Sequence, residues 1–232
     1  MTDSHFVGTS GKHMPSYINK DALTTHTKYT SEVGKLFAQK FKNKNIEAVV
    51  APAVAGIPLS QWTAYHLTRL RPDRPEVLAL YSEHDDQNLV GPKKENGDIS
   101  VTIGNTVISL TEGEQIILRR PRFVLKRGFD VDISGKRVLE IEDVLTTGGS
   151  AAKIADAIKS AGGILVGLAV LVNGGNVTPE ACHVDYIKAL INVEREIFTE
   201  EECIDHELCA KGVPINTDFG HGKAFLDRKQ QA

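Results

Sequence analysis

Residues 138–150 read VLEIEDVLTTGGS and place a strand, an acidic pair and a Gly-rich turn in one short stretch. The apolar strand runs into Glu142 and Asp143, a turn of threonines and glycines follows, and a helix is predicted to begin at Ser150. Glycines let the backbone approach a ligand closely, and hydroxyls beside the free N–H groups of a helix start bind anions. The stretch therefore predicts an anion-binding loop at the carboxyl end of a strand, where open α/β sheets bind their ligands.

The acidic pair narrows the kind of anion that would bind. Carboxylates repel a bare phosphate, so Glu142 and Asp143 fit a ligand that also carries hydroxyl donors or a metal ion. A ribose 5-phosphate satisfies both parts, because its ring hydroxyls can donate to the carboxylates while its phosphate lies over residues 146–150. The alternative is an ordinary Gly-rich turn before a Ser-capped helix, which leaves the acidic pair unexplained. A Walker phosphate loop is excluded, because no Gly-Lys-Ser or Gly-Lys-Thr ends the turn.

The segments on either side of this stretch alternate between strands and helices. Helical spacing of apolar residues predicts helices over 25–42, 59–70 and 150–161. Short apolar runs predict strands over 46–51, 77–81, 137–142 and 164–172. Such alternation favours a central parallel sheet with helices on both faces.

Residues 83–127 break this alternation, because they are polar and contain only short alternating runs, at 99–103, 106–110 and 115–118. We interpret this segment as a hairpin-bearing insertion or a flexible loop that acts as a lid. The length of 232 residues is that of one domain with elaborations. We therefore predict a single α/β domain over residues 1–232.

Composition excludes several classes of function. The formal net charge is −3, so neither nucleic acid nor a membrane surface would find a broad basic field to bind. No apolar run approaches the ~18 residues of a membrane helix, and the N-terminus lacks the basic and apolar regions of a secretion signal. The three cysteines are an odd set. We expect a cytoplasmic protein with reduced thiols.

VLEIEDVLTTGGS resembles the phosphoribosyl diphosphate (PRPP) signature of the type I phosphoribosyltransferases. The resemblance implies the fold of that family, including a small hood, which here would come from residues 1–24 and about 173–232. It implies transfer of the phosphoribosyl group of PRPP to a nitrogenous base, with Mg²⁺ bound alongside PRPP, by a homodimer. Glu142 and Asp143 would be the catalytic pair that holds the ribose hydroxyls. The residues that bind the rest of the ribose phosphate would be Val144, Leu145, Thr146, Thr147, Gly148, Gly149 and Ser150.

The run VVAPAVAGIPLS at 49–60 resembles the diphosphate loop of the same family. In that loop a strand ends and small residues leave backbone N–H groups free to bind the leaving group; a tight strand-to-helix turn is the alternative interpretation. The corresponding residues are Ala53, Val54, Ala55 and Gly56. Lys126 and Arg127, at the end of the insertion, could offset the charge of the departing diphosphate, or could be basic decoration of an edge strand.

Residues 9–23 and 123–144 resemble the orotate branch of the family in particular. This makes orotate the first candidate for the acceptor base, giving orotidine 5′-phosphate in pyrimidine nucleotide biosynthesis. The residues expected to contact the base are Lys12, Asn19, Lys20 and Thr146, although the lysines could equally be solvated charges.

Two departures from the family pattern keep other functions open. The segment YSEHDDQNLVGPKKENG at 81–97 is acidic where the family has a basic loop, leaving Lys93 and Lys94 as candidates for its catalytic lysine. The sequence LVNGGNVT at 171–178 lacks the arginine that binds the carboxylate of orotate in many relatives. A transferase for another base, and a PRPP-sensing regulator or inactive homologue, therefore remain alternatives.

The C-terminal segment raises the question of a metal. Cys203, His206, Cys209 and His221 offer two thiols and two imidazoles, which could form a zinc site. They contain no Cys-x-x-Cys pair, and a tail loop packed on the core is the other interpretation. We assign no metal-binding residue from the sequence.

Overall fold

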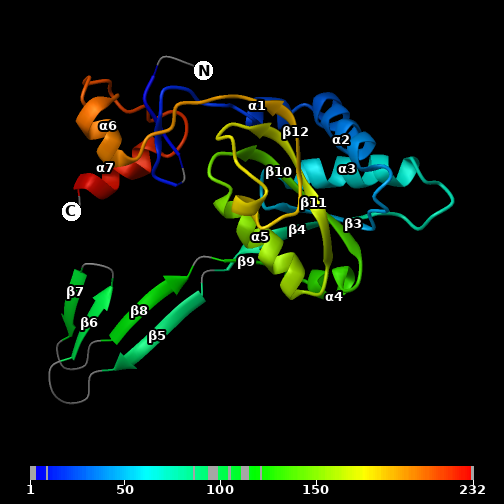
Figure 1. Ribbon diagram of the computed structural model, residues 1–232, viewed down its shortest axis with the longest axis horizontal. Coiled ribbons are helices and arrows are strands. Elements are labelled where there is room, and N and C mark those ends of the chain that lie inside the picture. The colour runs from blue at the N-terminus through cyan, green and yellow to red at the C-terminus, as the bar shows by residue number, and fades with distance from the viewer. Residues whose placement is uncertain are drawn as a thin grey trace.

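A six-stranded sheet lies at the centre of the computed structural model (Figure 1). The structure describes residues 4–8, 10–85, 87–93, 99–103, 106–110, 115–120 and 122–230, with only the backbone described between 87 and 120. The sheet has the order β12-β11-β10-β3-β4-β9, and its first five strands are parallel. These strands are β3 (Ala48–Pro52), β4 (Leu78–His84), β9 (Phe123–Val124), β10 (Arg137–Leu145), β11 (Ile164–Asn173) and β12 (Ile187–Asn192). The predicted parallel α/β fold is confirmed.

Helices cover both faces of this sheet, as the alternation predicted. On one face, α2 (Thr27–Phe41) and α3 (Ile57–Arg69) bury Phe37, Phe41 and Leu59 against Leu139 and Ile141 of β10. On the other face, α5 (Gly149–Ser160) packs with the short α4 (Phe129–Ile133) in a second apolar cluster. Successive residues of β10 point to opposite faces, so Val138 packs in the second cluster while Leu139 packs in the first.

The two end segments of the described chain meet in one small lobe, the hood, at the upper left of Figure 1. It consists of β1 (Phe6–Val7), β2 (His13–Met14), α6 (Glu200–His206) and α7 (Gly222–Gln230) with their connections. His5 bridges to Ile215, and His13 bridges to Phe198. α1 (Asp21–Thr24) leads from the hood into α2, and a 3₁₀ turn, η1 (Glu180–Cys182), precedes β12. Part of the segment predicted as hood and tail, namely β12, extends the central sheet instead.

The insertion consists of strands that leave the sheet between β4 and β9. β5 (Gln87–Lys93) pairs with β8 (Gln115–Arg120), and β6 (Ile99–Ile103) pairs with β7 (Thr106–Leu110), all antiparallel. Figure 1 shows this arm extending away from the rest of the molecule. The three alternating runs predicted β6, β7 and β8, whereas β5 was missed because GPK interrupts its pattern.

Two strand ends were predicted too early. β10 continues through the acidic pair to Leu145, because the backbone of Glu142 and Val144 pairs with Val170 and Val172 of β11. β4 continues to His84, where it pairs with Phe123 of β9. Both extensions contain polar side chains that an apolar pattern does not count.

Within the described residues, no helix combines the length and hydropathy that crossing a membrane requires.

Candidate active site

The connections of β3 and β10 run in opposite directions at the carboxyl edge of the sheet, the arrangement in which open α/β sheets have a ligand crevice. These neighbouring strands pair only over Ala48–Val50 and Val138–Glu140. The chain leaves β3 through α3 toward β4, and leaves β10 through α5 toward β11 on the opposite side. In open α/β sheets, ligands bind at such a change of direction. Both Gly-containing loops singled out in the sequence begin at this edge.

Glu142 and Asp143 lie near the carboxyl end of β10, each only 5% exposed. One oxygen of each carboxylate is held locally: Asp143 N donates to Glu142 Oε1 at 3.1 Å, and Val144 N donates to Asp143 Oδ1 at 2.6 Å. Burial, followed by the negative charge of Asp143, raises the pKa of Glu142 well above its usual range. Two buried acids side by side thus call for a cation or hydrogen-bond donors.

Lys20 supplies one cation. Its Nζ lies 2.8 Å from Asp143 Oδ2, and it reaches the acidic pair from the segment between the hood and α1. Burial opposes its charge, but the attraction of Asp143 and their hydrogen bond outweigh this and raise the pKa of Lys20. The sequence predicted that Lys20 contacts the base, whereas its observed partner is Asp143 of the acidic pair.

The loop after β10 presents backbone donors above the acidic pair. Gly148 has φ +80°, and a Cβ there would lie 2.8 Å from Val177 Cγ1 and 2.9 Å from Cys182 Sγ, so only glycine fits. The amides of residues 147–150 have no hydrogen-bond partner among the described residues. Thr147, Gly149 and Ser150 are exposed, at the start of the twelve-residue helix α5. An anion can therefore reach free N–H groups and hydroxyls together.

The glycines that replace the expected arginine have a packing reason. A Cβ on Gly175 would lie 2.0 Å from Thr146 O, and Gly174 N donates to Leu145 O at 2.9 Å. The loop after β11 thus lies directly against the backbone of the loop after β10. A side chain at 175 would push the anion-binding loop out of place.

The second loop, residues 53–56, is only partly open. Ala53 N donates to Ser82 O and Gly56 N donates to Pro52 O, so these two amides are used internally. The amides of Val54 and Ala55 have no partner among the described residues, and the Val54 side chain is 80% exposed. The Ala53–Val54 peptide is cis. The predicted row of free N–H groups is thus reduced to these two.

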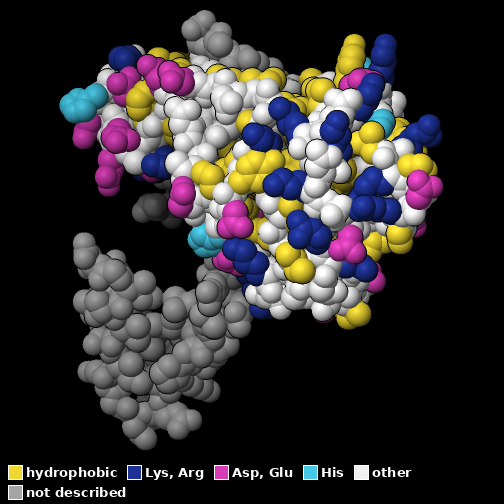
Figure 2. Space-filling model, turned by 45° about the vertical axis from the view of Figure 1, so that its right-hand side comes forward, with side chains coloured by type: hydrophobic (Ala, Val, Ile, Leu, Met, Phe, Trp, Pro, Cys, Tyr) yellow, Lys and Arg dark blue, Asp and Glu magenta, His cyan; other side chains and the backbone are white. Residues whose placement is uncertain are grey.

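Two surface cavities of about 500 Å³ lie at the opposite, amino edge of the sheet. Arg71 and Arg74 line both, but Arg71 donates to Ile46 O and Arg74 to Asn45 Oδ1. Figure 2 shows Lys and Arg side chains spread over the α/β core, with Asp and Glu concentrated toward the hood. Basic residues at the amino edge thus form part of a general surface pattern, whereas the Gly-rich turns and the buried acids meet at the carboxyl edge.

Comparison with known proteins identifies the family of this chain. The model of the phosphoribosyl transferase domain matches residues 19–205. This chain belongs to that family. It is 30% identical over 214 residues to the orotate phosphoribosyltransferase of Desulforamulus reducens, covering 92% of this chain and 87% of that protein. A Thermus thermophilus protein of the same name is 29% identical, covering 93% of this chain and 92% of its own.

A solved structure shares the fold. The orotate phosphoribosyltransferase of Mycobacterium tuberculosis H37Rv superposes with a TM-score of 0.50 at 18% identity, over 82% of this chain and 88% of that one. The resemblance inferred from the sequence is therefore confirmed, as is the assignment to the phosphoribosyltransferase enzymes.

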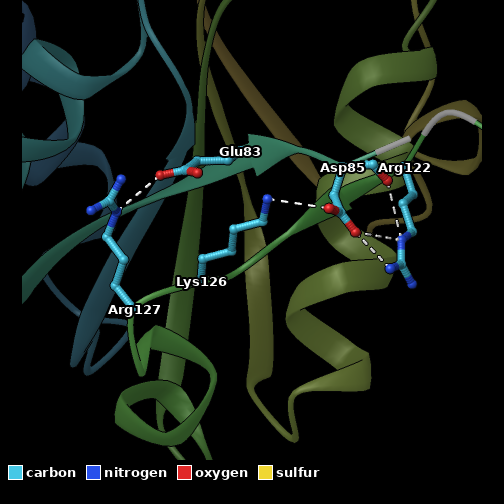
Figure 3. Close-up of polar contacts among 5 residues, drawn as sticks. All are labelled: Glu83, Asp85, Arg122, Lys126 and Arg127. Carbon is cyan, nitrogen blue, oxygen red and sulfur yellow. Dashed lines mark hydrogen bonds and ion pairs between the residues drawn. The ribbon is translucent and has the colours of Figure 1, made fainter. Parts of the chain in front are cut away.

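Lys126 and Arg127, which were predicted to bind diphosphate in this phosphoribosyltransferase, form ion pairs with acidic side chains (Figure 3). Arg127 Nε lies 3.0 Å from Glu83 Oε1, and Lys126 Nζ lies 3.2 Å from Asp85 Oδ1. Arg122 shares Asp85 through a contact of 2.6 Å. Both predicted cations are exposed and lie in the turn between β9 and α4. Their use in binding diphosphate requires them to exchange these partners.

Other predicted residues of the phosphoribosyltransferase have separate local roles. Asn19 Oδ1 accepts from Ala22 N at 3.3 Å and so supports the start of α1. Lys12 lies in the turn before β2, where its charge contributes to the lowered pKa of Glu202 after the hydrogen bonds at Thr199. The structure therefore brings Lys20, but not Asn19, into contact with the acidic pair. The side chains of Lys93 and Lys94 lie outside the described residues.

Arg195 is a site candidate that the sequence reasoning missed. It follows β12, and its Cδ and Nη1 would lie 3.0 and 3.2 Å from a Cβ on Gly174. It donates to Ser16 O at 2.6 Å and approaches Met14 Sδ at 2.8 Å. Its approach to Gly174 links residues far apart in sequence, so no local motif indicated it.

Proposed function

We propose that this phosphoribosyltransferase transfers the phosphoribosyl group of PRPP to orotate, with release of diphosphate. The relatives named orotate phosphoribosyltransferase, one of them 30% identical over most of the chain, support the choice of acceptor. The single observation that carries the donor is the buried pair Glu142 and Asp143 beneath a loop of free amides. A ligand must offer hydroxyls to the first and phosphate to the second.

The chemistry that this geometry favours is electrostatic. As the C1–O bond to diphosphate breaks, the electron pair leaves with diphosphate and the ribose gains oxocarbenium character. The base nitrogen, whose N–H proton is released to solvent, then donates its electron pair to C1. Glu142 and Asp143 would hold the ribose hydroxyls, and the amides of residues 147–150 would hold the 5-phosphate. Holding the ring still while charge separates lowers the barrier.

The leaving group would lie near Val54 and Ala55, whose amides have no protein acceptor among the described residues. Two amides provide modest stabilisation for several negative charges. Lys126 and Arg127 would add to it when substrate draws them from Asp85 and Glu83. This exchange costs little, because exposed ion pairs each contribute only about 0–1 kcal/mol.

Mg²⁺ fits the same proposal. The donors of the acidic pair are carboxylate oxygens, the type of ligand that Mg²⁺ prefers together with substrate phosphates. Lys20 is the one cation that contacts this pair among the described residues. We propose that Glu142 and Asp143 receive Mg²⁺ with PRPP, where the ion would neutralise diphosphate charge.

Arg195 would bind the carboxylate of orotate. The part of the chain that the structure describes gives it no carboxylate partner, only a carbonyl, a hydroxyl and a thioether. Burial lowers the pKa of its guanidinium, and a desolvated cation gains from an anion that forms two hydrogen bonds with it. The proposed contact would replace the arginine that LVNGGNVT lacks.

We also propose that the protein acts in the cytoplasm as a homodimer in pyrimidine nucleotide biosynthesis. Size-exclusion chromatography with light scattering would measure the oligomer directly, and a monomer at assay concentration would contradict this part of the proposal.

A panel assay tests the function. Purified protein would be mixed with PRPP, Mg²⁺ and one base at a time, and diphosphate release would be followed. We expect release with orotate and much less with adenine, hypoxanthine or uracil. Diphosphate release with a different base only would show that this base, and not orotate, is the acceptor. PRPP binding detected by calorimetry, without diphosphate release for any base, would indicate a regulator.

Substitutions connect that assay to the site. Asp143→Asn removes an acceptor from a ribose hydroxyl, and hydrogen bonds to charged groups contribute about 1.5–3 kcal/mol, or roughly 10- to 150-fold in PRPP affinity. Asp130→Asn, at an exposed position of α4, is the matched control and should bind PRPP normally. Unchanged PRPP binding after Asp143→Asn combined with Thr147→Ala would refute the donor site.

A further inference from the structure

Four metal-binding side chains meet inside the hood, away from the two loops at the carboxyl edge of the sheet. The ligand atoms of His5, His13, Cys203 and Cys209 all lie within 4.8 Å of one another. His5, His13 and Cys203 are at most 1% exposed, and Cys209 is half-buried. Two histidines from the N-terminal strands thus converge with two cysteines from α6 and the turn after it.

The spacing of these atoms suits a tetrahedral ion. Cys203 Sγ lies 3.6 Å from His5 Nε2, and Cys209 Sγ lies 3.9 Å from His5 Nε2 and 3.7 Å from His13 Nδ1. Bonds of about 2.3 Å to sulfur and about 2.0 Å to nitrogen give S–N edges of about 3.5 Å in a tetrahedron. The two nitrogens are 2.6 Å apart and would separate by about 0.7 Å around an ion with these bond lengths.

Hydrogen bonding orients one imidazole as a ligand. His5 Nδ1 lies 2.8 Å from Val213 O, and a carbonyl only accepts, so the proton is on Nδ1 and the lone pair of Nε2 faces the cluster. Metal-bound histidines are commonly oriented by such a second hydrogen bond. The two cysteines are also linked through the backbone, because Cys203 Sγ accepts a hydrogen bond from Cys209 N at 3.3 Å.

We propose that His5 Nε2, His13 Nδ1, Cys203 Sγ and Cys209 Sγ bind one Zn²⁺ ion. Two thiolates and two imidazoles form a soft, neutralising set typical of zinc, and four protein ligands leave no position for substrate. The ion is therefore structural. It ties the strands β1 and β2 to α6, and so fixes the segment that carries Met14 and Ser16 toward Arg195.

The four proposed zinc ligands differ from the four residues that the sequence of the C-terminal segment offered as a zinc site. The cysteines are those considered in the sequence, but their partners are His5 and His13, whereas His206 and His221 are exposed. This difference gives a direct test, because His206 lies in the same helix as Cys203 but outside the cluster. Cys182, buried beside α5, is the matched cysteine.

Metal content of the untagged full-length protein, purified without chelator, tests the site. We expect one zinc ion per chain in the wild type, loss of that ion in Cys209→Ser and His13→Gln, and retention in Cys182→Ser and His206→Gln. Circular dichroism and calorimetry with PRPP would establish which variants remain folded.

Cobalt replaces zinc without mutation and reports the ligands. In the wild-type chain we expect the strong visible bands of tetrahedral Co²⁺ and a thiolate charge-transfer band, both lost in folded Cys209→Ser. Octahedral cobalt, no bound metal after zinc is supplied to reduced protein, or a Cys203–Cys209 disulfide in freshly purified protein would overturn the proposal. None of these readouts depends on turnover, so the proposed function can fail independently.

Discussion

Arg195 is a half-buried cation whose side chain contacts only neutral acceptors among the described residues. It lies against Gly174, at the position where sequence reasoning looked for an arginine and found none. Arg195 could instead have a structural role, because its hydrogen bonds to Ser16 and Met14 attach the hood to the segment after β12. Kinetics can separate these two roles.

Arg195→Ala should raise KM for orotate by roughly 10- to 150-fold, the cost of about 1.5–3 kcal/mol for a lost charged hydrogen-bond pair. KM for PRPP should change little, and Arg195→Lys should recover part of the loss because it keeps the charge but loses the planar fork. Steady-state kinetics with each substrate varied checks this. Arg69→Ala, an exposed arginine of α3, is the control. Equal changes in both KM values would point to a purely structural role.

Glu140 is a buried acid that the proposed reaction does not use. Neither of its oxygens has a hydrogen-bond partner among the described residues. Burial, followed by the charge of Glu142, raises its pKa well above the ordinary value of 4.5. The folded protein therefore retains a proton that the unfolded chain releases. This contribution to stability is complete below pH 4.5 and is lost as pH rises toward the folded-state pKa.

Glu140→Gln should remove that loss. As pH rises above about 5, the free energy of unfolding of the variant should gain on that of the wild type, by at most ~1.4 kcal/mol per pH unit for one proton. Urea unfolding at a series of pH values measures the difference. Parallel profiles for the two proteins would show that Glu140 does not titrate this way, and Asp130→Asn should leave the wild-type profile unchanged.

Among the elements, the two loops at the carboxyl edge depend on each other. The sequence predicted the strand, the turn and the helix start around this loop, because these parts are contiguous. It could not predict that Gly174 and Gly175 support this loop from behind, since that contact joins β11 to β10. The absence of an arginine from LVNGGNVT therefore reflects close packing as well as specificity.

Gly175→Ala should destabilise the protein by about 1–3 kcal/mol or more, because a Cβ would lie 2.0 Å from Thr146 O. Gly149→Ala is the matched control, since its Cβ would meet nothing closer than 3.7 Å and alanine favours the helix start. Thermal unfolding of the two variants gives the comparison. Similar melting temperatures would mean that the loop shifts at no cost.

At the scale of the whole molecule, periodicity predicted the sheet and its two layers of helices, because β3 and β11 are continuous apolar runs that need cover on both faces. The contacts between the N-terminal and C-terminal segments of the hood could not be predicted from the sequence. His5, His13 and Lys12 carry no signal that they will meet residues near 200 and 210, and no short motif spans such a distance. The arm between β4 and β9 was recognised from composition and alternation.

The pairing of β4 with β9 predicts that the arm can be removed. Asp85 N donates to Arg122 O at 3.1 Å, and Glu83 lies opposite Val124, so an Asn-Gly turn replacing residues 86–121 would close a regular hairpin. We expect the shortened chain to keep its melting temperature within a few degrees and to bind PRPP, while diphosphate release falls. Calorimetry and the release assay measure both, and failure to fold would show that the arm stabilises the sheet.

The joining of the two end segments in the hood also sets an order of assembly. The α/β core is complete in sequence once β12 has been made, so its strands and helices can pack while the remaining chain is still being synthesised. His5 and His13 must wait for Val213 and Phe198, and such distant contacts form slowly. Lys20 lies where the N-terminal segment leaves the hood, and Arg195 lies where the chain enters the hood after β12. We therefore expect the proposed base-binding half of the site to be the last part of the protein to form.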